Sequence, residues 1–364
     1  MRVKEIISFL EEWAPPSYQE SYDNSGCIVG DLEMEVTGIL CALDCIESVV
    51  DEAIQRNCNM IVAHHPILFS GIRKLNGKDY VERTIIKALK HDIAIYAIHT
   101  NLDNIYNGVN AKIAERIGLT NTKVLMPKTD VLSKLEFYCP EEEAEKIKES
   151  LFEIGVGNFS NYSNCSFNII GLGTFMPSIN ADPSIGEVGK LHQGQELKVE
   201  VVFPSFMNDK VIKTLKKVHS YEEVAYQLIE LKNADQNVGT GIIGVLKEQM
   251  EPKVFLEHLK RSMCLSMIRH TELTNKSIRK VAVVGGSGSF ALPSAIAQQA
   301  DIFISADFKY HQFFDADGNI IIADIGHYES EAFTIELLGD RLMEKFPNFV
   351  VLLSEVNTNP VSYT

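Results

Sequence analysis

Short apolar segments alternate with helical segments along the first part of the chain, and this alternation limits the fold more than any other feature. Strand–helix alternation at this spacing is typical of βαβ units around a mainly parallel sheet. The segments follow from their apolar periodicity. Strands are expected at residues 36–43, 60–63 and 93–98, and helices at 3–13, 46–56, 81–91 and 109–117.

The same rhythm returns near the C-terminal end, after a stretch of different character. Strands are expected there at residues 242–246, 280–284, 302–305, 319–323 and 349–353, and helices at 252–263, 295–299 and 329–346. Between the two parts, residues 127–237 show the order strand, helix, strand, strand, helix, strand, which is typical of a ferredoxin-like fold. We therefore expect an α/β body made of residues 1–126 and 238–364, with residues 127–237 inserted as a separate α+β domain.

Composition excludes several classes of protein. The chain has 364 residues and a formal net charge of −15, which argues against a general affinity for nucleic acid or for anionic membranes. No apolar run approaches the roughly 20 residues that span a bilayer, and residues 1–5 lead into an amphipathic helix instead of a signal sequence. Seven scattered cysteines without a C-x-x-C pair indicate a reduced, cytoplasmic protein.

Two adjacent histidines, His64 and His65, follow the predicted strand 60–63 directly, and Pro66 then ends that strand. In open α/β sheets, ligands bind at the carboxyl ends of strands. Neutral imidazole is the commonest metal ligand in proteins. Adjacent strand residues point to opposite faces, so both can reach one site only if the chain turns there. The pair therefore predicts a metal only if ligands come from elsewhere.

Such ligands follow two other strands. His99 and Asp103 come after the strand 93–98, and His327 comes after the strand 319–323. Glu331 lies four residues beyond His327, a spacing that places both on one helical face. The ligand set is then His64, His65, Asp103, His327 and Glu331. Three imidazoles with two carboxylates suit a dinuclear site for zinc, iron, manganese or nickel, but neither an oxygen cage for magnesium or calcium nor a thiolate zinc site.

Several features have two interpretations from sequence alone. The glycine-rich segment 285–289 could hold phosphate with its backbone N–H groups, or it could be a tight turn near the site. His99 and His311 could orient ligands, relay protons or be purely structural. The segment His219–Glu223 could be a ligand cluster, although a solvated turn is the expected reading.

Six motifs in this order resemble the Nif-three-like family, whose members are often called GTP cyclohydrolase I type 2 homologues. They are YDNSG at 22–26, AHHP at 63–66, HTNLD at 99–103, GGSGS at 285–289, DFKYH at 307–311 and GHYESE at 326–331. The insert resembles the PII- or CutA-like domain of long bacterial members, except that Ser220 stands where they commonly have proline.

The resemblance implies two metal ions per subunit. His65 and Asp103 would bind one, His64 and His327 the other, and Glu331 would bridge them. It also implies a toroidal homohexamer with the metal sites facing an internal cavity.

Two classes of function follow. The first is a metal-dependent hydrolase of a nucleotide or another phosphorylated small molecule, with GTP cyclohydrolase action as the form that the family label names. The second is a non-catalytic protein that stores, delivers or senses metal. Open coordination positions with turnover favour the first, and saturated coordination with ready metal exchange favours the second.

Overall fold

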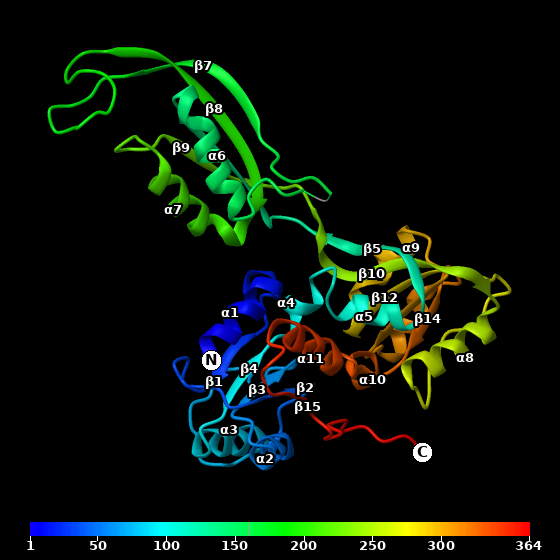
Figure 1. Ribbon diagram of the computed structural model, residues 1–364. Helices are drawn as coiled ribbons and strands as arrows, with labels where there is room; N and C mark the ends of the chain where they lie inside the picture. Colours follow the sequence, from blue (N-terminus) through cyan, green and yellow to red (C-terminus); the bar gives the residue numbers. More distant parts are fainter. Residues whose placement is uncertain (160) are drawn as a thin grey trace. The chain divides into compact units, whose positions relative to one another are not determined.

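The computed structural model describes residues 1–159 and 161–364, which divide into two compact units. Unit 1 consists of Met1–Pro127 together with Asn237–Thr364, and unit 2 consists of Lys128–Gln236. Unit 1 contains two sheets and unit 2 a third (Figure 1). The fold class predicted from the sequence, an α/β body with an inserted α+β domain, is confirmed.

The first sheet of unit 1 is mainly parallel. Its order is β1 (Gly26–Val29), β4 (Ala94–Ala97), β3 (Met60–Ala63), β2 (Ile39–Ala42) and β15 (Val351–Leu353). Only β1 runs antiparallel to its neighbour. Each residue of β2, β3 and β4 is buried, as expected for strands that are covered on both faces. Helices α2 (Glu47–Gln55) and α3 (Tyr80–Lys90) pack on one face, and α11 (Thr334–Lys345) packs against β2 and β15.

The second sheet of unit 1 is mixed. Its order is β11 (Arg269–His270), β14 (Ile321–Asp324), β13 (Ile302–Ala306), β12 (Ile278–Ser287), β10 (Asp235–Met250) and β5 (Leu119–Lys128). The three central strands β12, β13 and β14 are parallel, whereas β11 is antiparallel to β14 and β10 is antiparallel to β12. The remaining helices of this unit are α1 (Val3–Trp13), α4 (Thr100–Asp103), α5 (Val109–Arg116), α8 (Pro252–Met263), α9 (Leu292–Ala297) and α10 (His327–Glu331).

Two expected elements differ from the structure. The helix expected at 329–346 is two helices, α10 and α11, separated at residues 332–333. The segment 17–30, where no strand or helix was expected, contains the edge strand β1. Both differences come from tertiary contacts: β1 is held by its pairing with β4, and α10 is held by the bond from the Gly286 N–H to Ser330 Oγ, 2.9 Å long.

Unit 2 has the ferredoxin-like order. Its elements are β6 (Leu132–Cys139), α6 (Ala144–Glu153), β7 (Phe167–Phe175), β8 (His192–Pro204), α7 (Asn208–Val218) and β9 (Tyr226–Leu231). The antiparallel sheet has the order β7-β8-β6-β9, and its core is formed only by residues of this unit. The expectation of a solvated turn is wrong for His219. Its buried ring bonds the Tyr138 carbonyl through Nε2 and accepts from the Tyr221 N–H at Nδ1.

Across the described residues, none of the helices combines the length and the apolar character that crossing a bilayer requires.

Candidate metal centre

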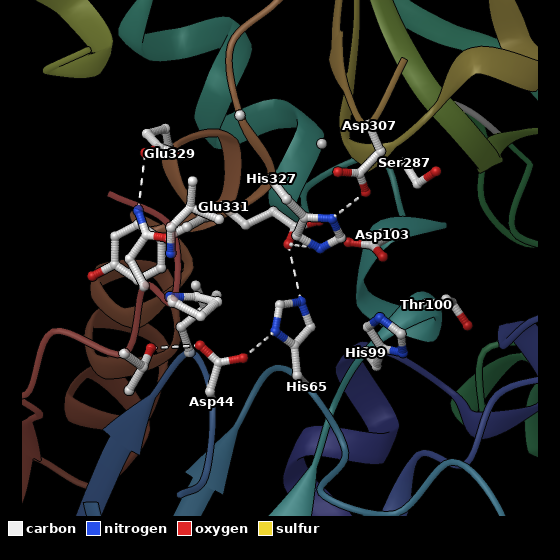
Figure 2. Close-up of a pocket in the computed structure, with 18 of the residues that line it drawn as sticks. Asp44, His65, His99, Thr100, Asp103, Ser287, Asp307, His327, Glu329 and Glu331 are labelled. Carbon is white, nitrogen blue, oxygen red and sulfur yellow. Dashed lines mark hydrogen bonds and ion pairs between the residues drawn. The ribbon is translucent and has the colours of Figure 1, made fainter. Parts of the chain in front are cut away.

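The carboxyl ends of the parallel strands in both sheets of unit 1 meet at one cavity of about 1230 Å³. Asp44 follows β2, His64 and His65 follow β3, and His99 follows β4. From the second sheet, Asp307 follows β13 and His327 follows β14. Figure 2 shows His65, His99, Asp103, His327 and Glu331 around this cavity. Parallel strands thus bring together side chains that are far apart in the sequence, as expected for this sheet type.

The five side chains predicted as metal ligands lie together. His65 Nε2 is 3.0 Å and His327 Nε2 is 3.1 Å from the same oxygen, Glu331 Oε2. His64 Nε2 is 3.6 Å from Asp103 Oδ1. Three groups of side chains have ligand atoms within 4.8 Å of one another. They are His64 with His65 and His99, His65 with His327 and Glu331, and His64 with Asp103 and Glu331.

Each of the four histidines at the cavity has its Nδ1 atom fixed by an acceptor. The acceptors are Ile98 O for His64 at 2.8 Å, Asp44 Oδ1 for His65 at 2.8 Å, Asp23 Oδ1 for His99 at 2.7 Å and Asp307 Oδ2 for His327 at 2.7 Å. Because these oxygens can only accept, Nδ1 carries the proton. Nε2 is then the atom that each ring presents to the other ligands of the site, which is the usual arrangement of metal-binding histidines.

The three aspartates in this arrangement were not predicted as site residues. Asp23 and Asp307 lie inside motifs that the sequence analysis singled out, but nothing in those motifs states which histidine each one contacts. Asp44 lies in no motif. Its position directly after a predicted strand was the available signal, because β2 and β3 are parallel neighbours whose ends lie side by side.

The His64 and Asp103 pair fits a bound cation. His64 Nε2 and Asp103 Oδ1 are buried and have no hydrogen-bond partner. Burial lowers the pKa of His64 to about 3. Burial and the nearby Glu331 carboxylate raise the pKa of Asp103 well above its ordinary value. Without a cation, His64 is neutral at neutral pH and therefore offers no charge that would favour ionisation of the Asp103 carboxyl. A divalent metal would satisfy both atoms and would favour the ionised carboxylate.

Around Glu331, in contrast, hydrogen bonds and neighbouring charges outweigh the effect of burial on the pKa values. Burial opposes the charged form of His65, but hydrogen bonds to Asp44 and Glu331 outweigh it and raise the pKa to about 10. His327 is raised in the same way to about 9, through Glu331 and Asp307. Although burial opposes ionisation of Glu331, the two imidazoles hold its pKa well below the ordinary value. In the metal-free protein, protons therefore occupy the atoms that a metal would bind.

The structure brings His99 to the site but not His311. His99 lines the cavity, and its ring lies 5.9 Å, centroid to centroid, from Phe69. His311 is exposed on the 3₁₀ helix Tyr310–Ala316, where its ring contacts Tyr310 and Phe314, and it does not line the cavity. A role of His311 in the chemistry of this cavity therefore has no geometric support within one chain.

The glycine-rich segment forms the irregular end of β12, close to the metal ligands, and leads into a 3₁₀ helix at Ser289–Ala291. Gly286 has φ +60°, and a Cβ atom there would collide with Glu331 Oε1. The N–H groups of Gly285 and Gly286 are already used, since they donate to Asn110 Oδ1 and Ser330 Oγ at 2.9 Å each. The two N–H groups are thus not available to a phosphate, and the segment passes close to the site as the other interpretation expected, but as a strand end instead of a tight turn.

The charges that line the cavity are mostly negative. Arg269 is the only arginine or lysine among the described lining residues. The acidic lining residues are Glu20, Asp44, Glu47, Asp103, Asp307, Asp324, Glu329 and Glu331. A cavity of this sign attracts cations.

The comparisons with known proteins identify the family. Residues 1–360 match the family described as Duf34/NIF3 (NGG1p interacting factor 3). The chain belongs to the Duf34/NIF3 family. Two bacterial members are both named GTP cyclohydrolase 1 type 2 homolog. The one from Bacillus subtilis is 36% identical over 99% of this chain and 98% of its own length, and the one from Staphylococcus aureus is 34% identical over the whole of both chains. A Bacillus cereus protein related to NIF3 has a solved structure with a TM-score of 0.87 and 35% identity, covering 100% of this chain and 99% of its own.

Proposed function

We propose that this Duf34/NIF3 member is a dinuclear metal-dependent hydrolase of a nucleotide or another phosphorylated small molecule. The observation that carries the metal site is the pair of buried, unpartnered atoms, His64 Nε2 and Asp103 Oδ1, beside a carboxylate that two further histidines contact. Zinc is the first candidate metal, with iron, manganese and nickel as alternatives for this ligand set.

The distances favour a pairing of ligands that differs from the one implied by family resemblance. His64 lies nearest Asp103, whereas His65 and His327 share one oxygen of Glu331. We therefore assign His64 and Asp103 to one metal and His65 and His327 to the other. Glu331 would supply a ligand to both, because its carboxylate belongs to both groups.

A hydrolase also needs a group that moves protons. A bound metal of this kind supplies polarisation and lowers the pKa of coordinated water to about 7. His99 can take a proton at Nε2 because Asp23 fixes its Nδ1–H. Since Arg269 is the only arginine or lysine among the lining residues that the structure describes, phosphate oxygens would depend on the metals for most of their neutralisation.

The test removes all metal with a chelator and then measures hydrolysis of a panel of nucleotides, including GTP ring opening, before and after each candidate metal is restored. We expect activity only in reloaded protein, and a large loss in His99→Gln with metal content unchanged. Activity that persists without metal would eliminate this mechanism.

A second function has its own observation. The side chains of His327 and Asp307 are 40% and 47% exposed, so a metal bound at this edge has a direct route for exchange. A metal-handling protein would use that route. Fast transfer of zinc to an acceptor chelator, with no turnover of any nucleotide, would favour this function over the hydrolase.

We also propose a homohexamer in the reducing cytoplasm. On β7, Phe167, Ile170 and Leu172 are 64%, 58% and 72% exposed, and apolar surface of this kind supports self-association. All seven cysteines are free thiols, which fits a reducing compartment. Light scattering coupled to gel filtration tests the hexamer, and a monomer at micromolar concentration would contradict it.

A further inference from the structure

The segment that follows β15 is fastened to unit 1 at its start. The Ser354 N–H donates to the Cys41 carbonyl at 2.8 Å, and its hydroxyl donates to Glu52 Oε2 at 2.5 Å. Val356 packs against the core beside β2 and α2. These contacts direct the chain across the end of β2, towards the cavity whose rim it lines at Thr358 and Asn359.

Thr358 continues a chain of hydrogen bonds that ends at a proposed metal ligand. Its hydroxyl donates to Asp44 Oδ2 at 2.5 Å. The other oxygen of Asp44 accepts from His65 Nδ1 at 2.8 Å, and Figure 2 shows these two side chains. His65 Nε2 then faces Glu331. Because a carboxylate can rotate about its bond to Cβ, a donor on its second oxygen restricts the direction in which it holds the imidazole.

The next residue contacts the other half of the site. Asn359 Nδ2 donates to Glu329 Oε1 at 3.0 Å, and Glu329 lies between His327 and Glu331 on α10. Two consecutive residues, Thr358 and Asn359, therefore link the strand end that carries His65 with the helix that carries the remaining ligands.

We propose that Thr358 is a positioning residue of the metal centre, acting through Asp44 to fix the orientation of His65. This inference rests on the metal site of the proposed function, but not on the hydrolysis. Residues that hold a metal-binding histidine in place typically contribute 10- to 100-fold to metal affinity.

The experiment measures the zinc affinity of the full-length, metal-stripped protein by competition with a chromophoric chelator. We expect Thr358→Val, which has nearly the same shape, to lower zinc affinity by about tenfold. Thr358→Ser keeps the hydroxyl and should retain the affinity. Ser362→Ala removes an exposed hydroxyl from the same segment and serves as the matched control. Cobalt(II) in place of zinc should give an altered visible spectrum only in Thr358→Val.

A double-mutant cycle with Asp44→Ala tests whether Thr358 acts through Asp44. In the Asp44→Ala background, Thr358→Val should cause no further loss. Wild-type affinity in Thr358→Val, or losses that simply add in the double variant, would overturn the proposal. Failure of the metal site itself is distinguishable, because His65→Ala would then bind zinc as tightly as the wild-type protein. Failure of the hydrolase alone would leave these affinity differences in place.

Discussion

The Oδ1 atom of Asp103 is buried and has no hydrogen-bond partner, and the same is true of the neighbouring His64 Nε2 atom. Its pKa is raised, mainly by burial, relative to its value in the unfolded chain. For a carboxyl group, a raised pKa in the folded state means that stability falls as pH rises above the unfolded value. At neutral pH the metal-free protein therefore bears a cost at Asp103 that a bound cation removes.

Asp103→Asn should separate metal binding from stability. The amide cannot ionise, so we expect the variant to lose most of its metal. Its metal-free form should unfold at a temperature at least as high as that of the wild-type protein, because the cost of the buried carboxyl is gone. Elemental analysis and thermal unfolding in chelator measure the two effects, with the exposed Asp340→Asn as control. Normal metal content in Asp103→Asn would remove Asp103 from the ligand set.

Metal binding should release protons. The pKa of His65 is raised to about 10 and that of His327 to about 9, so both rings are protonated at neutral pH in the metal-free protein. A metal needs the neutral ring, hence its affinity should rise with pH up to these values. Calorimetry of zinc binding in buffers of different ionisation enthalpy counts the protons. A zinc affinity that does not change with pH around neutrality would contradict this assignment.

At the scale of elements, the sequence was most informative where a strand is uniformly buried or a helix has one buried face. The predicted strand 60–63 and the helix 252–263 coincide with β3 and α8. The break between α10 and α11 could not be predicted, because residues 332–333 contain neither glycine nor proline. The edge strand β1 was missed because four residues with one long-range partner leave no periodic pattern.

The irregular end of β12, at Gly286, gives a test of how closely the elements approach at the site. Gly286→Ala would place a methyl group against Glu331 and 3.2 Å from His327 Cε1, at a positive φ. We expect zinc affinity to fall, and stability to decrease by about 1–3 kcal/mol. Urea unfolding and zinc titration measure the two effects. Gly71→Ala is the control, because a Cβ atom there has no neighbour within 4 Å. If Gly286→Ala changed neither zinc affinity nor stability, Glu331 would be free to move away from the added methyl group.

At the scale of the whole molecule, the sequence predicts that the carboxyl ends of the parallel strands meet at one site. It does not predict the directions in which the side chains around these strand ends point. The ligand set was assembled from parallel strands and one helical spacing, and all five of its members do line one region. The contacts of Asp44, Asp23 and Asp307 depend on loops that carry no periodic signal. His311 follows a strand end as His99 does, yet its 3₁₀ helix leaves it exposed outside the cavity.

The two units should respond differently to metal. Their hydrophobic cores share no residues, and the proposed ligands all belong to unit 1. The single tryptophan, Trp13, is in α1 of unit 1, so its fluorescence reports the unfolding of that unit alone. A ligand present at 100 times its Kd stabilises the state that binds it by about 2.7 kcal/mol.

Zinc should therefore raise the temperature of the unfolding transition that Trp13 fluorescence reports. Circular dichroism should also show a second unfolding transition, whose temperature zinc does not change. Joining Pro127 to Asn237 with a short linker, in place of residues 128–236, should remove the second transition and keep the first, with its zinc response. The joint is feasible in the sheet, because β5 and β10 are neighbours there. If both probes instead followed one transition that zinc shifted as a whole, the units would unfold together. A deletion variant unable to bind zinc would show that the site needs the inserted unit.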